Sequence, residues 1–116
     1  MTKVLHTEQA PAAIGPYVQG VDLGNMVLTS GQIPVNPTTG EVPEEIAAQA
    51  RQSLDNVKAV VESSGLQVSD IVKMTVFVKD LNDFAAVNEV TVTSSTSTMH
   101  HTQHVLALKL RVYQKM

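Results

Sequence analysis

Three histidines near the C-terminal end are the first side chains in this sequence that could perform chemistry. The spacings of His100, His101 and His104 would bring imidazoles together on one face of a helix, where they could ligate a metal ion. The surrounding residues are poor helix formers, no acidic residue follows Glu89, and the chain has no cysteine. We therefore predict that the chain holds no native metal site.

Other catalytic signatures are missing. A Ser-His-Asp arrangement could be assembled from the many serines, but no nucleophile-elbow motif singles one out. The sequence contains neither a P-loop nor a dinucleotide-binding fingerprint. With no cysteine, the chain also lacks disulfides, thiolate metal ligands and a thiol nucleophile.

The composition is that of a single globular domain. The chain has 116 residues, of which 43% are hydrophobic and 16% charged. A net charge of −3 and 3% aromatic residues argue against binding to nucleic-acid phosphates or stacking on bases. No apolar run is long enough for a signal sequence or a membrane span, so we expect a cytoplasmic protein without membrane or nucleic-acid partners.

The first 43 residues predict short strands joined by turns, because they hold all five prolines and five of the six glycines. Two apolar stretches, Tyr17–Leu23 and Met26–Ile33, fit strands, and Asp22–Asn25 between them predicts a hairpin turn. A further strand can open the chain at Lys3–His6.

A helix is predicted over residues 43–65. Its apolar residues recur at spacings of three and four, with Pro43 in the first turn and Gly65 as a left-handed cap. The predicted buried face consists of Ile46, Ala50, Leu54, Val57 and Val61.

A second strand-and-helix unit is predicted to follow. Residues 71–79 favour a strand whose apolar face, formed by Val72, Met74, Val76 and Val78, covers the first helix. Asp83 can cap a helix that continues through Asn88. The elements predict an α+β fold, a mixed β-sheet with two helices packed on one face, and an uncovered opposite face that favours subunit association.

The last part of the chain is anomalous. The hydroxyl-rich tract Thr91–Thr98 should not continue the helix. From Val105 onward apolar residues alternate with others, a pattern typical of a strand.

Four motifs carry a family resemblance. They are Gly15-Pro16-Tyr17-Val18-Gln19, Ser30-Gly31-Gln32-Ile33-Pro34, residues 49–58 (QARQSLDNVK) and residues 73–84 (KMTVFVKDLNDF). In this order and spacing they closely resemble the Rid (RidA/YjgF) family of reactive intermediate deaminases, over about residues 3–90 of this single domain. The resemblance implies a chorismate-mutase-like fold that forms a homotrimer with pockets at the subunit interfaces. It also implies hydrolysis of enamines and imines, such as 2-aminoacrylate, to 2-oxoacids and ammonia, without a metal or organic cofactor.

The same resemblance proposes substrate-binding residues. Tyr17, the backbone at Ser30 and Gly31, and Asn88 match positions that help to hold the ligand in the family. Structural roles remain open for three of them: Tyr17 as a half-buried aromatic, Gly31 as a tight strand end and Asn88 as a solvent-facing helix residue. We interpret Arg51 as a cation on the helix surface.

Beyond Val90 the sequence departs from the family, which continues with an Arg-Ser-Cys strand and a final strand carrying a glutamate that orients water. A one-nucleotide change of reading phase accounts for the departure. Taking the third base of each codon with the first two bases of the next, the pairs from His104-Val105 onward permit Arg, Ser, Cys, Val, Glu, Val, Ala, Arg, Leu, Pro, Lys and Asp, which is the family's own strand. Met99-His100 likewise forces Ala.

We therefore predict that residues 91–116 are out-of-frame translation and that the chain as written lacks the catalytic arginine and glutamate. A diverged tail with its own role is the alternative. Two other functions also stay open: a non-catalytic trimer that binds 2-oxoacids, and a ribonuclease or translation-inhibitor role.

Overall fold

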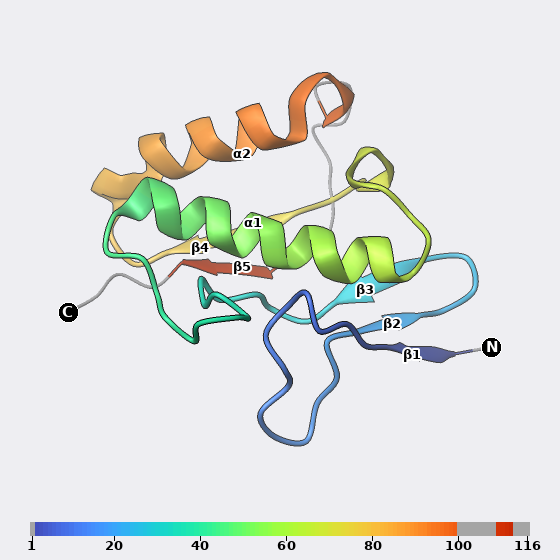
Figure 1. Ribbon diagram of the computed structural model, residues 1–116. Coiled ribbons are helices and arrows are strands. Elements are labelled where there is room, and N and C mark those ends of the chain that lie inside the picture. The colour runs from blue at the N-terminus through green and yellow to red at the C-terminus, as the bar shows by residue number, and fades with distance from the viewer. Residues whose placement is uncertain (1, 100–108, 113–116) are drawn as a thin grey trace.

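A computed structural model describes the backbone of residues 2–99 and 109–112 and the side chains of residues 2–91 (Figure 1). In chain order, the elements are β1 (Lys3–Leu5), β2 (Gly20–Asp22), β3 (Val27–Thr29), α1 (Ile46–Ser63), the 3₁₀ turn η1 (Val68–Asp70), β4 (Thr75–Val78), the 3₁₀ turn η2 (Leu81–Asp83), α2 (Phe84–Met99) and β5 (Lys109–Val112).

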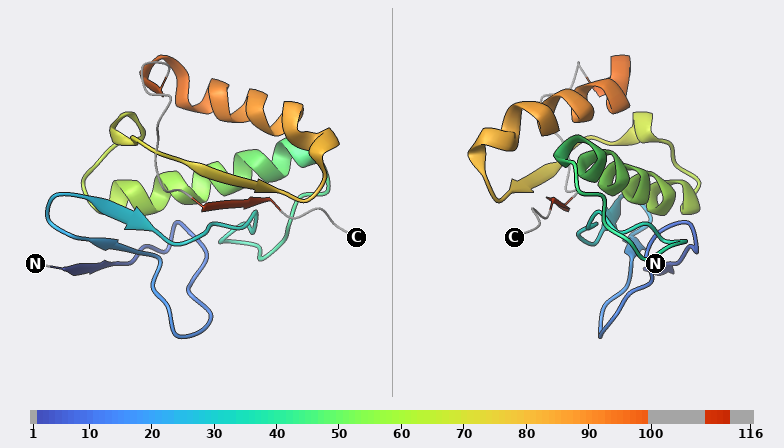
Figure 2. Two further views of the ribbon diagram at one scale, coloured as in Figure 1. Left: turned by 180° about the vertical axis from the view of Figure 1, so that it is seen from behind. Right: turned by 60° about the vertical axis from the view of Figure 1, so that its left-hand side comes forward.

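The strands form two ladders beside the two helices. β1, β2 and β3 are antiparallel neighbours, whereas β4 and β5 pair in parallel, with Val76 opposite Leu110. In the views of Figures 1 and 2, α1 lies over the strands and α2 lies beyond it. The predicted α+β class with two helices is confirmed, and the antiparallel and parallel pairings of the predicted mixed sheet occur in separate ladders.

The predicted hairpin between β2 and β3 is confirmed. The Leu23 amide donates to the Met26 carbonyl at 2.8 Å, and Gly24 adopts a φ of +96°. The Asp22 side chain closes the turn by accepting the Gly24 amide at 2.8 Å. Both strands are three residues long, shorter than predicted.

The apolar face predicted for α1 is the centre of the main core. Ala50 and Val57 are 0% and 1% exposed, and they pack with Val87 and Val90 of α2. Partly buried side chains of β4, including Val76, cover the same cluster. A second, smaller cluster joins Val60 of α1 to Leu5 of β1. One helix therefore organises both layers.

The ends of α1 test the predicted boundaries. The helix begins at Ile46, so the placement of Pro43 in its first turn was wrong; Pro43 instead accepts the Gln49 side chain on its carbonyl at 2.7 Å. Gly65 ends the helix as predicted, with a φ of +92° and its amide donating to Glu62 at 3.0 Å.

The strand predicted over residues 71–79 is confirmed only at Thr75–Val78. Residues 71–74, between η1 and β4, do not form part of the strand. Ile71 packs against the core, whereas Val72, predicted to face the helix, is 64% exposed.

The helix α2 begins at Phe84, directly after Asp83 as predicted, but its C-terminal end differs from the prediction. Its N-terminal side is preceded by η2, where the Asp80 carboxylate accepts the Asn82 amide at 2.9 Å. The prediction that the helix stops before Thr91–Thr98 was wrong, because its backbone continues to Met99. The Thr91 hydroxyl shows how such a residue is accommodated: it donates to the Val87 carbonyl one turn earlier, at 2.8 Å.

The predicted C-terminal strand is present as β5. His100, His101 and His104 lie outside the described residues, so the metal prediction remains a prediction there. Among the residues that are described, no cluster of three or more histidine, cysteine or acidic side chains could hold a metal ion. No helix in this part of the chain has the length and apolar character needed to span a membrane.

Because Leu54 is 8% exposed in the main cluster, Leu54→Ala is expected to lower the free energy of unfolding by about 2–5 kcal/mol through lost burial and a cavity. Urea unfolding measures the change. Leu81→Ala is the matched control, because Leu81 is 84% exposed. Equal losses for the two variants would contradict the assignment of the core.

Candidate functional site

Two of the residues predicted to bind substrate, Ser30 and Gly31, directly follow β3, and this position is called the corner below. The Ser30 amide and hydroxyl both donate to the Gln19 carbonyl, at 2.9 and 3.0 Å. Ser30 is partly buried, whereas Gly31 beside it is exposed. The backbone at this corner is therefore fixed by hydrogen bonds and remains accessible at Gly31.

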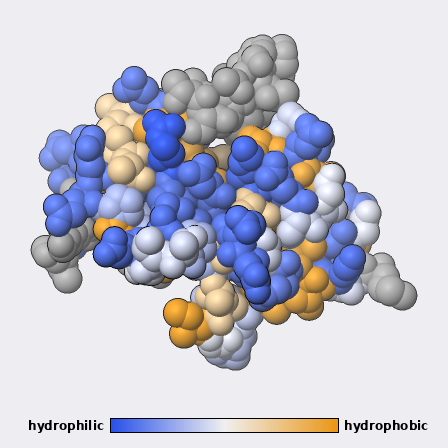
Figure 3. All heavy atoms as spheres, viewed as in Figure 1, coloured by the Kyte–Doolittle hydropathy of each residue, from blue (hydrophilic) through white to orange (hydrophobic). Residues whose placement is uncertain are grey.

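Tyr17 lies on a loop that projects next to this corner. Its ring is 53% exposed, and its hydroxyl accepts the Ile14 amide at 3.4 Å. The loop turns at Gly15, whose φ is +132°. Ile14 is 88% exposed, and Figure 3 shows hydrophobic atoms projecting at the bottom of the molecule, where Figure 1 places the loop between β1 and β2.

The segment that follows Gly31 is anchored by α1. Asn56 is fully buried, and its amide nitrogen donates to the carbonyls of Ile33 and Val35, both at 2.9 Å. Its amide oxygen accepts the Gln52 side chain at 3.0 Å. The corner at Ser30 and Gly31 is thus held by β2 on one side and by α1 on the other.

Gln19 and Asn56 are site-supporting residues that the sequence prediction missed. One signal was available: Gln49, Ser53 and Asn56 recur at helical spacing beside the apolar face, and all three are buried. Most buried polar side chains are hydrogen-bonded, so such a position indicates a residue that can anchor a neighbouring segment, as Asn56 does.

Asn88 lies apart from the other predicted site residues. It is exposed on α2. The views of Figures 1 and 2 agree that α2 and the loop between β1 and β2 lie on opposite sides of α1. In one copy of the chain, hydrogen bonds to Gln19 join the base of the loop that carries Tyr17 to Ser30, whereas Asn88 lies on α2.

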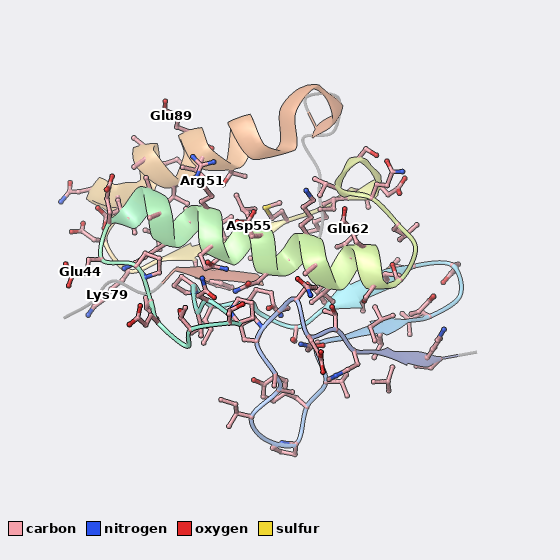
Figure 4. All side chains as sticks on the ribbon, viewed as in Figure 1. Glu44, Arg51, Asp55, Glu62, Lys79 and Glu89 are labelled. Atoms are coloured by element: carbon pink, nitrogen blue, oxygen red, sulfur yellow. The ribbon has the colours of Figure 1, made fainter. Side chains whose placement is uncertain are left out.

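Charged side chains follow the outer surface of α1. Figure 4 shows Arg51, Asp55 and Glu62 along this helix, and Arg51 is exposed, as predicted for a surface cation. A groove of about 420 Å³ runs between the helix and the start of the β1–β2 connection. It is lined by Thr7, Gln9, Asp55, Lys58, Ala59, Glu62 and Ser63, none of which belongs to the predicted site.

This α+β architecture is the class seen in solved structures of similar chains. The YjgF gene product of Escherichia coli superposes with a TM-score of 0.78 and 64% identity, covering 95% of this chain and 85% of that one. Escherichia coli TdcF, solved with bound serine, gives a TM-score of 0.79 and 54% identity over 97% of this chain and 85% of its own.

Comparison of the sequence with family models shows the family to which the chain belongs. The model of the family described as Endoribonuclease L-PSP matches residues 7–112, so the chain belongs to that family. The 2-iminobutanoate/2-iminopropanoate deaminase of Escherichia coli K12 is 80% identical over 88 residues, which are 76% of this chain and 69% of the relative. The family resemblance predicted from the four motifs is confirmed, and the relatives by which it is recognised are enzymes.

The identities are not spread evenly along the alignments. The sequence alignment with TdcF of Escherichia coli K12 gives 67% of 90 residues, about 60 identical positions, over 78% of this chain and 70% of the relative. The structural alignment gives 54% over 97% of 116 residues, about 61 identical positions. The roughly 20 additional aligned residues therefore contribute almost no identity.

Asn56→Ala is expected to destabilise the segment after Gly31, because two backbone carbonyls lose their donor; the free energy of unfolding should fall by about 2 kcal/mol. Urea unfolding measures this loss. Asn82→Ala is the matched control, because Asn82 is exposed and its side chain makes none of the hydrogen bonds described. A loss no larger than that of the control would argue against the anchoring role.

Proposed function

We propose that this chain has the scaffold of an enamine/imine deaminase, which hydrolyses intermediates such as 2-aminoacrylate to 2-oxoacids and ammonia. The observation that carries the proposal is the 80% identity over 88 residues to a relative named 2-iminobutanoate/2-iminopropanoate deaminase. The bound serine in TdcF supports a small substrate with a carboxylate.

The reaction sets clear chemical requirements. Water adds to the imine carbon and ammonia leaves, so the site must hold the substrate carboxylate, contact the imine and position one water. Tyr17, the Ser30 hydroxyl and the Gly31 backbone can provide polar contacts. The family's arginine for the carboxylate has no counterpart in the sequence of residues 3–90, where the only arginine is Arg51, exposed on α1.

We propose that the family's arginine is missing because of a change of reading phase near codon 90, which makes residues 91–116 an out-of-frame tail. The family-like segment 3–90 has 88 residues, the length of the match to the Escherichia coli deaminase. The almost complete loss of identity in the additional residues aligned with TdcF also supports this proposal. The family match through residue 112 favours the alternative, a diverged tail.

The functional assembly is proposed to be a homotrimer. Asn88 and Tyr17 lie on opposite sides of α1, so one pocket can contain both only if two copies contribute. Exposed apolar residues on the strands provide surface for association: Val4, Leu28 and Phe77 are 58%, 36% and 50% exposed.

The decisive experiment compares two proteins: the chain as written and the product of a gene whose phase is restored at codon 90. The chain as written should show no hydrolysis of 2-aminoacrylate above background, because the carboxylate of the substrate has no arginine partner. The restored product should be active and trimeric. Ammonia and 2-oxoacid release measure activity, and light scattering measures the assembly.

Normal turnover by the chain as written would overturn the out-of-frame proposal. An inactive restored product that still binds a 2-oxoacid would favour the non-catalytic binding trimer. Sequencing the DNA around codon 90 provides a check that is independent of folding.

The family description also names an endoribonuclease. A net charge of −3 and 3% aromatic residues count against RNA as the substrate. RNA cleavage by the restored product that is lost in Tyr17→Ala would support a ribonuclease at this same corner.

A further inference from the structure

One buried amide connects the two segments of the candidate site. Gln19 is 2% exposed and directly precedes β2. Its side-chain oxygen accepts the Thr7 amide at 2.7 Å. Its side-chain nitrogen donates to the carbonyls of Thr7, Ala10 and Pro11, at 3.0, 3.2 and 2.8 Å.

The backbone of the same residue holds the other segment. The Gln19 carbonyl accepts both hydrogen bonds from Ser30, so this residue ties β3 to residues 7–11. The loop of residues 12–18, which carries Tyr17, starts at Pro11 and ends at Gln19. Both ends of the loop therefore meet at one side chain.

We propose that Gln19 is a positioning residue for the substrate pocket, fixing the Tyr17 loop relative to Ser30 and Gly31. The inference rests on the proposed deaminase function and assigns Gln19 no contact with substrate. Gln19 acts by closing the base of the loop, and this closure fixes the position of Tyr17, which lies two residues before Gln19.

The hydrogen bonds made by the side chain at position 19 require an amide, which can both accept and donate. A carboxylate at this position could still accept the hydrogen bond from the Thr7 amide, but it has no N–H group to donate to the three carbonyl oxygens. A leucine would fill a similar volume and leave one amide and three carbonyls without their partner. Neither substitution changes Tyr17 or Ser30 themselves.

The experiment introduces Gln19→Leu and Gln19→Glu into two proteins, the full chain and the phase-restored product. Gln49→Leu is the matched control: Gln49 is 1% exposed, and its side chain donates one hydrogen bond, to Pro43, outside the candidate site. In the full chain, amide hydrogen exchange at Thr7 should accelerate at least about tenfold in both Gln19 variants and stay within about twofold in the control.

In the restored product, the Gln19 variants should raise KM for 2-aminoacrylate about tenfold or more, with a smaller change in kcat, because binding groups move away from their positions. The control should keep both constants. An active restored product whose Gln19→Leu kinetics equal those of Gln49→Leu would overturn this inference alone. An inactive restored product would overturn the proposed function, and the inference with it.

Discussion

The burial of one side of α1 is the constraint on which the rest of this structure depends. That side carries an apolar stripe, which includes Ala50 and Val57, and a neighbouring polar stripe of Gln49, Ser53 and Asn56. The apolar stripe joins α2 and β4 in one core and leads to β1 through Val60. Within the polar stripe, Asn56 fixes the backbone that follows Gly31. A single helix thus supplies both the packing and the hydrogen bonds that shape the candidate site.

Much of this arrangement could be predicted because the first 65 residues carry strong local signals. Glycine and an Asx side chain specified the turn at Gly24, and the three-four spacing specified the buried face of α1. The start of β4 could not be predicted, because no distinctive sequence pattern marks residues 71–74 as lying outside the strand. The helix α2 continues past Thr91, whose hydroxyl donates to the preceding turn, and intrinsic propensity does not describe such a hydrogen bond.

For a related reason, only part of the candidate site could be predicted from the sequence. Motifs predict residues that contact ligands, such as Tyr17 and Ser30, but they do not show which residues hold these in place. Gln19 and Asn56 lie within two of the motifs, and their supporting roles come from backbone groups 8 to 12 and 21 to 23 positions away in the chain. Asn88 lies on α2, on the other side of α1 from the loop that carries Tyr17, and the residue spacing in the sequence does not encode this separation.

Three buried polar atoms have no hydrogen-bond partner in the part of the chain that is described: the Thr29 hydroxyl, the Ser53 hydroxyl and the side-chain oxygen of Gln49. Enclosing such a group unbonded opposes folding by about 1–3 kcal/mol. Each of the three atoms can still form a hydrogen bond, so a polar group that reaches one of them would stabilise the folded chain.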